Sequence, residues 1–324
     1  MDDQSMLLLG VDGGGTKTTI VACNCSGEYL GSVSCGSINY NAVGMKTARE
    51  NIASGIERIL RKTGQKDYRF ITIGHSALDD VATEEEKTAF AETIIHTDKL
   101  YMLSDADVAL KGSTLGNYGM LIISGTGSMG VAVDKAGVKY IAGGWGYLLH
   151  DAGSGFAIGM GALLSAVRDH ERGVSGALEH AVKAHFNVQE IRAVIPVIYA
   201  EGFLPSSIAS LAKEVKKIAK EGDQEANRIL KEAAGHLADI VFSLFRQAKG
   251  ALDGAPVYVY GSILQKNQIV RREFERLVHE RHPGTLIAVP KLPAECGSLI
   301  FSAEHCGLFG EDFVRKLEKT YYCA

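Results

Sequence analysis

The sequence predicts an α/β protein that contains two copies of one lobe. Its 324 residues allow about two domains of ~100–200 residues each. An order of apolar run, glycine-rich turn, apolar run, polar turn and third apolar run occurs twice. Superimposing Gly15-Thr16 on Gly125-Thr126 also brings Val21 onto Val131. Helical stretches and further strands follow both copies, and a cleft between two such lobes is a common place for a ligand.

The first lobe begins with a meander of short strands, because β-branched and apolar runs alternate with glycine-containing turns. Isoleucines at helical spacing then predict a helix, and two strand-helix pairs follow. The elements expected in order are the strands Leu7–Val11, Thr18–Cys23 and Tyr29–Cys35, the helix Thr47–Arg61, the strand Phe70–Gly74, the helix Glu84–Ile95 and the strand Leu100–Leu103. A seam is expected at residues 116–119, where the sequence reads GNYG.

The second lobe repeats the meander and then becomes mostly helical over residues 153–250. The elements expected there are amphipathic helices over Ile208–Ala219 and Gln224–Gln247, strands over Pro256–Tyr260 and Leu286–Val289, and a helical end from Ala294. We place the lobes at residues 1–117 and 118–324. The last helix is expected to pack back on the first lobe.

Composition excludes several classes of protein. Lys and Arg number 34 and Asp and Glu 38, a net charge of −4, whereas nucleic-acid-binding proteins usually carry a basic excess. The apolar runs fall far short of the ~20 residues that span a bilayer. Six cysteines in so long a chain do not resemble a disulfide framework, and the start MDDQSM is unlike a signal peptide. We therefore expect a cytoplasmic protein without a nucleic-acid or membrane partner.

Two glycine-rich turns, one in each lobe, could hold phosphate, and two of the three common explanations for them fail. Residues 10–18 (GVDGGGTKT) have Thr16 where a P-loop needs lysine, and a strand-like run follows instead of a helix. Residues 125–130 (GTGSMG) match the dinucleotide fingerprint, but a strand follows and the acidic residue ~20 positions on is missing. β-Hairpin turns remain, in which backbone amides and the Thr16 and Thr126 hydroxyls face phosphate oxygens.

A family resemblance rests on six short segments spread along the chain. Residues 10–17 (GVDGGGTK), 123–128 (ISGTGS) and 259–263 (VYGSI) resemble the first phosphate, second phosphate and adenosine motifs of the actin, sugar-kinase and heat-shock-chaperone ATPase superfamily. Residues 37–44 (SINYNAVG), 143–146 (GGWG) and 151–155 (DAGSG) resemble its N-acetylglucosamine kinase branch, also called the BadF-type ATPase family. The resemblance covers nearly the whole chain.

The resemblance implies two actin-like, ribonuclease H-like lobes with a nucleotide cleft between them. It implies an ATP- and Mg²⁺-dependent kinase, expected as a homodimer, that phosphorylates the 6-hydroxyl of N-acetylglucosamine or a close amino sugar. The alternatives are an N-acetylmuramic acid or glucosamine kinase, and an ATPase that activates an acyl-CoA dehydratase or reductase. Such activators often carry an iron–sulfur cluster held by thiolates. Here Cys296 and Cys306 lie near the C-terminus and not in a glycine-rich loop between the lobes, which disfavours this alternative.

The resemblance implies a catalytic role for Asp105, which would accept the proton of the sugar hydroxyl and contact the sugar. Asp107, two residues on, is the competitor. If a helix starts near Ser104, Asp107 is a first-turn acid that interacts with the helix N-terminus. Asp12 lies at the end of the first strand, where it can hold a water-bound Mg²⁺, because this ion prefers one or two carboxylates together with substrate phosphates. The alternative for Asp12 is an Asx-turn cap.

Sugar-binding positions follow from the same resemblance, because amide and carboxylate side chains pair with hydroxyls. Ser76 is a further residue that could touch the sugar, whereas Asn41 is expected to be a turn residue. Residues 150–154 read HDAGS where many relatives have GDEGS, so the accepted substituent is open. The sugar contacts expected besides Asp105 are Asn39, Trp145, Gly146 and Asp151.

Nucleotide-binding positions are expected in the glycine-rich turns, and the resemblance adds Ser262, Lys266 and Ala209 as adenosine contacts. Lys17 is either a phosphate contact or a solvated side chain, and Gly261 is explained by the close approach of a base to the backbone. The nucleotide contacts expected are Gly14, Gly15, Thr16, Lys17, Thr126, Gly127, Ala209, Gly261, Ser262 and Lys266. Cys23 and Cys25 have no further paired ligands for a zinc site, and no G-x-S-x-G elbow of a hydrolase is present.

Overall fold

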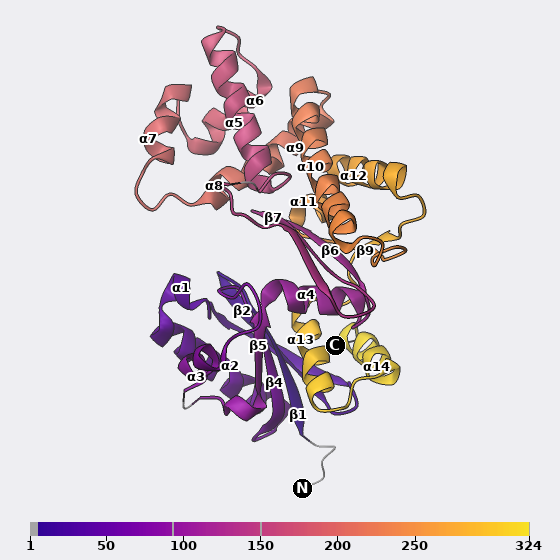
Figure 1. The fold of residues 1–324 in the computed structure, drawn as a ribbon. Coiled ribbons are helices and arrows are strands. Elements are labelled where there is room, and N and C mark those ends of the chain that lie inside the picture. The colour runs from indigo at the N-terminus through magenta and orange to yellow at the C-terminus, as the bar shows by residue number, and fades with distance from the viewer. Residues whose placement is uncertain (1–5, 93, 150, 324) are drawn as a thin grey trace. The chain divides into compact units, whose positions relative to one another are not determined.

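The computed structural model describes residues 6–92, 94–149 and 151–323. The chain forms two compact units, which are drawn in Figure 1. The first unit contains Met1–Asn117 together with Pro290–Ala324, and the second contains Tyr118–Val289. The second unit is therefore shorter than the expected lobe of residues 118–324, because residues 290–324 return to the first unit.

A five-stranded sheet with the order β3-β2-β1-β4-β5 forms the centre of the first unit. The first three strands are antiparallel neighbours, while β4 and β5 run parallel to β1. As a result, the carboxyl ends of β1, β4 and β5 lie at one edge of the sheet. The strands are β1 (Leu7–Gly13), β2 (Lys17–Asn24), β3 (Tyr29–Gly36), β4 (Tyr68–His75) and β5 (Leu100–Ser104).

Helices cover both faces of this sheet, because successive side chains of a strand point to opposite faces. Leu7, Leu9 and Val11 of β1 share a buried cluster with residues of α2 and α3, while Leu8 joins residues of α13 and α14. The helices are α1 (Tyr40–Val43), α2 (Met45–Thr63), α3 (Glu84–Ala91), the 3₁₀ helix η2 (Thr97–Lys99), α4 (Asp105–Thr114), α13 (Ala294–His305) and α14 (Glu311–Tyr321).

Close packing of α13 on β1 explains why the end of the chain belongs to the first unit. Ser298 Oγ donates a hydrogen bond to the carbonyl of Val11, and Ser302 Oγ donates one to the carbonyl of Leu9, both at 2.8 Å. A Cβ at Gly10 would lie 2.4 Å from the backbone oxygen of Glu295. Only glycine therefore allows this approach of helix and strand.

The sheet of the second unit repeats the topology of the first. Its order is β10-β9-β6-β7-β8, so that β6, β7 and β8 form an antiparallel meander and β9 and β10 run parallel to β6. The predicted duplication is thereby confirmed. The strands are β6 (Gly119–Ser124), β7 (Ser128–Val133), β8 (Lys139–Gly143), β9 (Val257–Tyr260) and β10 (Ile287–Ala288).

The helices of the second unit supply most of its core, and the long helix α10 buries a continuous apolar face against the sheet. The expected helix over Ile208–Ala219 is two helices in the structure, α8 and α9, which meet at Leu211. The helices are α5 (Gly155–Glu171), α6 (Ala177–Phe186), the 3₁₀ helix η3 (Ile191–Ala193), α7 (Val194–Ile198), α8 (Pro205–Ser210), α9 (Ala212–Lys220), α10 (Gln224–Ala248), α11 (Ser262–Lys266) and α12 (Gln268–Arg281).

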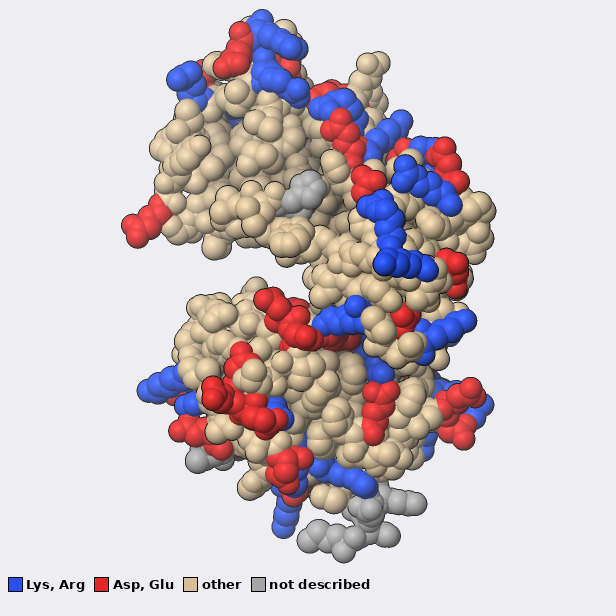
Figure 2. All heavy atoms as spheres, viewed as in Figure 1, with Lys and Arg blue, Asp and Glu red and all other residues tan. Residues whose placement is uncertain are grey.

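Surface charge is mixed on the face drawn in Figure 2, where Lys and Arg side chains alternate with Asp and Glu over each unit. Within the described ranges, no helix has the length and apolar character needed to cross a membrane.

Candidate functional site

In the first unit, the ends of three parallel strands carry polar residues. Asp12 lies at the end of β1, Ser76 directly follows β4, and Asp105 directly follows β5. The strand pairing places Gly13 opposite His75, and His75 opposite Ser104. Ser76 N–H also donates a hydrogen bond of 3.0 Å to the carbonyl of Gly13. These residues therefore gather at one edge of one sheet.

The β1–β2 turn leaves its tip open to solvent. Gly14 N–H donates to the carbonyl of Lys17 at 3.1 Å, and Ser37 Oγ donates to the carbonyl of Gly14 at 2.9 Å. Gly15 and Thr16 between them are exposed. A Cβ at Gly15 would meet no atom within 4 Å, so the packing of this unit does not require glycine there. The absence of a side chain leaves room for a ligand to approach the backbone.

Asp12 lies among other carboxylates. Burial first, and then the nearby charges of Glu295 and Asp105, raise the pKa of Asp12 to about 7, while Lys17 acts in the opposite direction. Burial also raises the pKa of Glu295, and Lys17 again opposes it. Glu295, at the start of α13, was missed by the sequence analysis. Lys17 therefore acts electrostatically on two carboxylates of its own unit.

Asp105 and Asp107 differ in their surroundings although they are two residues apart. Ser104 is the N-cap of α4, and its Oγ accepts from Asp107 N–H at 3.2 Å and donates to Asp107 Oδ2 at 2.7 Å. Asp107 is thus the first-turn acid that a helix start at Ser104 predicts. Asp105 is the first residue of α4, and burial, followed by the charge of Asp107, raises the pKa of Asp105.

Asn39 is held in place by both ends of its amide. Its Oδ1 caps α1 by accepting from the N–H groups of Asn41 (3.0 Å) and Ala42 (3.2 Å), and its Nδ2 donates to Ser76 Oγ at 2.9 Å. The side chain therefore connects the start of α1 to the end of β4. Among the described residues, Ser76 is the one hydrogen-bond acceptor of the Nδ2 group, which has two N–H donors.

In the second unit, the β6–β7 turn is tied to the start of α5. Gly155 N–H donates to the carbonyl of Gly125 at 2.8 Å, and Phe156 N–H donates to the carbonyl of Thr126 at 3.2 Å. These amides belong to the first turn of α5, whose N–H groups have no partner within the helix. The start of α5 therefore supplies the hydrogen bonds that the two turn carbonyls accept. The Thr126 side chain is exposed.

Asp151 joins the 143–146 segment to the same turn. Its Oδ1 accepts from Gly146 N–H at 3.0 Å, and a Cβ at Gly127 would lie 2.5 Å from its Oδ2. The structure thus brings together Asp151, Gly146 and Gly127. Trp145 is 67% exposed, so it is not a core residue of this unit. His150, which precedes Asp151, lies outside the described residues.

The residues expected to bind adenosine approach this turn from two other elements. A Cβ at Gly261 would lie 2.3 Å from the carbonyl oxygen of Ser124, and Gly261 has a φ of +93°. The sequence analysis attributed this glycine to the approach of a base, but the chain's own backbone already requires it. Ala209 lies against Gly155, its Cβ being 3.5 Å from the position of a Gly155 Cβ.

Ser262 and Lys266 begin and end the short helix α11, and both are exposed. The carbonyl of Lys266 accepts a hydrogen bond of 2.6 Å from Lys216 Nζ on α9. Lys216, which the sequence analysis did not select, therefore places a second positive charge beside the end of α11.

The surroundings of Asp12 suit a hard divalent cation. Negative charge is in excess around this largely buried carboxylate, and a cation would relieve it. Mg²⁺ in nucleotide sites commonly binds one or two carboxylates, waters and substrate phosphates. Among the described residues, no three His, Cys, Asp or Glu side chains form a group that could hold a metal ion. Water and substrate phosphate would therefore supply the other ligands of an ion near Asp12.

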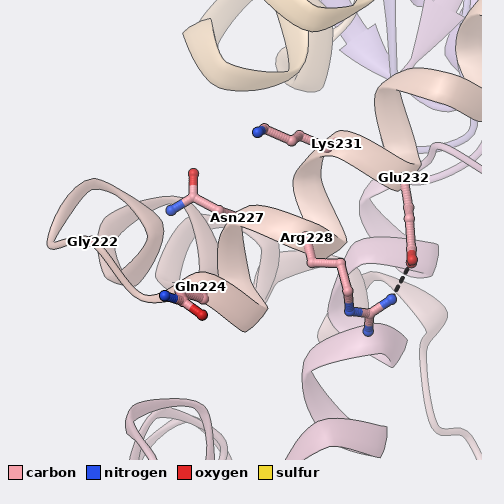
Figure 3. A pocket seen from close by; sticks show the side chains of 6 residues that line it. All are labelled: Gly222, Gln224, Asn227, Arg228, Lys231 and Glu232. Carbon is pink, nitrogen blue, oxygen red and sulfur yellow. Dashed lines mark hydrogen bonds and ion pairs between the residues drawn. The ribbon is translucent and has the colours of Figure 1, made fainter.

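A hollow of about 560 Å³ lies beside the first turns of α10 (Figure 3). Arg228 in it is paired with Glu232 and also with Glu225, and Asn227 Nδ2 donates to two backbone carbonyls. The polar groups that line it are thus largely satisfied within the chain. Its lining residues, which include none of the predicted site residues, are Gly222, Gln224, Asn227, Arg228, Lys231 and Glu232.

Comparisons with known proteins agree on one family. A family model described as the BadF/BadG/BcrA/BcrD ATPase family matches residues 9–299. An N-acetylmuramic acid/N-acetylglucosamine kinase of Clostridium acetobutylicum is 27% identical over 302 residues, which are 92% of this chain and 99% of that protein. An N-acetyl-D-glucosamine kinase of Dictyostelium discoideum is 28% identical over 297 residues, 87% of this chain and 92% of that one.

A solved structure supports the fold. The crystal structure of a protein from Chromobacterium violaceum, described as a candidate N-acetylglucosamine kinase, superimposes with a TM-score of 0.73 at 25% identity. The match covers 92% of this chain and 99% of that chain. The expected fold class is thereby confirmed.

Proposed function

The chain belongs to the BadF/BadG/BcrA/BcrD ATPase family, and we propose that it is an ATP-dependent amino sugar kinase that phosphorylates the 6-hydroxyl of N-acetylglucosamine. The observation that carries this proposal is the difference in surroundings between Asp105 and Asp107. Asp107 is hydrogen-bonded to its helix cap, whereas Asp105 keeps a carboxylate of raised pKa at the end of β5.

Asp105 is the proposed general base. It accepts the proton of the 6-hydroxyl while that oxygen forms a bond to the γ-phosphorus of ATP, and the bond from the γ-phosphorus to the bridging oxygen of ADP breaks. A carboxylate whose pKa is raised by burial accepts a proton more readily at neutral pH than a solvated one. The products are the sugar 6-phosphate and ADP.

The proposed sugar contacts are residues that the structure holds in place. Asn39 is fixed by its bonds to α1 and Ser76, and Asp151 by its bond from Gly146 N–H. Fixed amide and carboxylate groups select a hydroxylated ligand, because an analogue that lacks the matching group leaves them unpaired. The exposed ring of Trp145 offers an apolar face to the sugar or its N-acetyl group.

The proposed nucleotide contacts belong to three groups. The β1–β2 turn and the β6–β7 turn offer exposed hydroxyls and backbone amides to phosphate oxygens. Ala209 and the start of α11 are the proposed adenosine contacts, supported by their convergence on the Gly125–Gly155 pair. The residues are Gly14, Gly15, Thr16, Lys17, Thr126, Gly127, Ala209, Gly261, Ser262 and Lys266.

Mg²⁺ is the proposed cofactor beside ATP, held by Asp12 through water. The charge balance around Asp12 supports this, and Glu295 is the second carboxylate near the same position. When bound, the ion supplies neutralisation of phosphate charge.

The assembly and the compartment are also proposals. The second unit exposes apolar side chains such as Leu164, Ile195 and Tyr199, which supports a homodimer. None of the six cysteines, all of which the structure describes, is in a disulfide bond, which supports a reducing cytoplasm.

A coupled ADP-release assay over a panel of hexoses tests the function. We expect the highest kcat/KM for N-acetylglucosamine, and a lower value for glucose because it leaves the N-acetyl contacts unpaired. Faster turnover of N-acetylmuramic acid or glucosamine would favour those alternatives. Equal turnover of glucose and N-acetylglucosamine would contradict the proposal.

The iron content of the purified protein separates the kinase from an ATPase that activates a dehydratase. An activator of that kind would retain stoichiometric iron and release ADP without sugar. The kinase is expected to contain no stoichiometric iron and to release ADP only with a sugar acceptor.

A further inference from the structure

His75 is a buried residue next to Asn39 and Ser76 that the proposed mechanism does not use. It is the last residue of β4 and is fully buried. Its ring centroid lies 4.7 Å from that of Tyr40 on α1 and 5.3 Å from that of Phe90 on α3, with the Phe90 ring edge-on. The ring is thus enclosed by aromatic residues from two helices, and Tyr40 is the residue directly after Asn39.

The two ring nitrogens of His75 have different surroundings. Nδ1 accepts a hydrogen bond of 3.1 Å from Ala77 N–H, so the neutral ring carries its hydrogen on Nε2. Nε2 is buried and makes no hydrogen bond of ordinary geometry within the residues that the structure describes. The carbonyl of Ile38 is the backbone group that interacts with the ring. Burial lowers the pKa of His75 to about 4, so the ring is neutral at physiological pH.

The contacts of the His75 ring involve residues next to both partners of the hydrogen bond between Asn39 and Ser76. Ala77 N–H, bonded to Nδ1, fixes the turn that carries Ser76, and Ile38 immediately precedes Asn39. Asn39 Nδ2 donates to Ser76 Oγ at 2.9 Å. A phenylalanine would fill the same space between Tyr40 and Phe90, but it would bind neither Ala77 N–H nor the Ile38 carbonyl.

We propose that His75 is a positioning residue for sugar binding, which holds the Ile38–Asn39 segment and the Ser76 turn at the spacing that presents the Asn39 amide to the substrate. The inference rests on the proposed function of Asn39 as a sugar contact. His75 does not touch the sugar and takes no part in proton transfer. Its Nε2–H is a buried donor, and the Ile38 carbonyl is the backbone group that interacts with the ring.

Three substitutions separate the two nitrogens. His75→Phe keeps an aromatic ring and removes both nitrogens. His75→Asn places an amide oxygen near the position of Nδ1, so it can still accept from Ala77 N–H. His75→Gln places an amide N–H near the position of Nε2 and can still donate towards Ile38. We expect His75→Phe to raise the KM for N-acetylglucosamine about tenfold, roughly the effect of one lost net hydrogen bond. His75→Asn and His75→Gln should each restore part of that loss.

The expected pattern is a change in KM for the sugar alone. The kcat and the KM for ATP should stay within about twofold of the wild type. Leu317→Ala is the structural control, because Leu317 is fully buried on α14 in another cluster of the same unit. It should lower Tm and leave the KM for the sugar unchanged.

Two results would overturn the inference. One is a KM for the sugar that stays within twofold in all three His75 variants. The other is a rise in the KM values for sugar and ATP together, in proportion to the loss of Tm, which a merely structural role produces. If His75→Phe does not fold, His75→Asn and His75→Gln provide the same comparison.

A measurement without substrate keeps this inference separate from the proposed function. Hydrogen exchange of the backbone amides in residues 37–43 should be faster in His75→Phe than in the wild type and unchanged in Leu317→Ala. Unchanged exchange in all His75 variants would contradict the positioning role even if the kinase assay succeeds. If no amino sugar is phosphorylated but exchange responds as expected, the function of the site fails and the role of His75 in holding the segment remains.

Discussion

The two glycine-rich hairpin turns have the same topology and different surroundings. The β1–β2 turn of the first unit is accompanied by three carboxylates, Asp12, Asp105 and Glu295, whose pKa values are all raised by burial. The β6–β7 turn of the second unit instead receives two backbone N–H groups from the start of α5, at 2.8 and 3.2 Å.

The difference shows that duplication preserved the scaffold while the strand ends acquired separate chemistry. In the first unit, an acid directly follows β5 and β4 ends at a buried histidine. In the second unit, a glycine directly follows β9, and its positive φ lets the chain pass close to Ser124. This contrast supports the proposal that the first unit supplies the base and the cation site, and the second unit neutral hydrogen-bonding contacts to phosphate and adenosine.

Loss of the first unit's base should have the largest effect. Asp105→Asn keeps the size of the side chain but cannot accept a proton, so kcat should fall roughly 10²–10⁴-fold. Nucleotide affinity should be retained. Single-turnover transfer, with ATP and sugar affinities measured separately, checks this result.

Asp107→Asn is the matched control. It weakens the interaction with Ser104 and should lower Tm slightly while kcat stays within about tenfold. An inactive Asp107→Asn together with an active Asp105→Asn would exchange the two roles. Full activity of both variants would remove the general base from the account.

In the second unit, Gly261→Ala should act through stability. A Cβ there meets the Ser124 carbonyl at 2.3 Å and requires a φ that L-residues rarely adopt, so we expect a loss of about 2–4 kcal/mol in the free energy of unfolding. Urea unfolding measures it. An unchanged midpoint would show that the backbone does not need glycine at this position.

In the first unit, Gly15→Ala should act through the ligand instead. A Cβ there meets no atom within 4 Å and φ is not positive, so Tm should be unchanged. If phosphate approaches this backbone, the Kd for ATP should rise about tenfold, as titration calorimetry would report. Unchanged affinity would remove Gly15 from the phosphate contacts.

The raised pKa of Asp12 predicts a smaller effect, in which the stability of the folded chain depends on pH. The pKa of Asp12 is 3.8 in the reference state and about 7 in the folded chain, so the folded chain binds the extra proton between these values. The stabilisation from this proton is complete below pH 4 and is lost as pH rises through 7. Asp12→Asn lacks this loss, so without metal and nucleotide its Tm should exceed that of the wild type at pH 8 and approach it at pH 5.

Much of the fold could be predicted because its signals are local. The strand runs and the repeated turns lie within short windows, and the two sheets share the predicted duplicated order. The last helix was expected to pack on the first lobe, but the boundary at residue 290 depends on contacts between distant positions, such as Ser298 with Val11, which are 287 residues apart. No local periodicity reports such a contact.

The candidate site was predicted where a motif carries it and missed where only packing does. Asp105, Asp151 and the turn glycines lie in recognisable segments. Glu295 has no motif, and its relation to Asp12 arises from the close approach that Gly10 permits. His75 could be noticed only as a histidine after an apolar run, because its neighbours Tyr40 and Phe90 come from other elements.

The most direct test of the central claim is the identity of the phosphorylated atom. With ATP, Mg²⁺ and N-acetylglucosamine, the account predicts a product whose NMR spectrum shows phosphorus coupling at C6 and one ADP released per product. The 6-deoxy analogue should give no product, because it lacks the oxygen whose proton Asp105 accepts. Phosphate on another oxygen, or ADP release that does not depend on a sugar, would contradict the account.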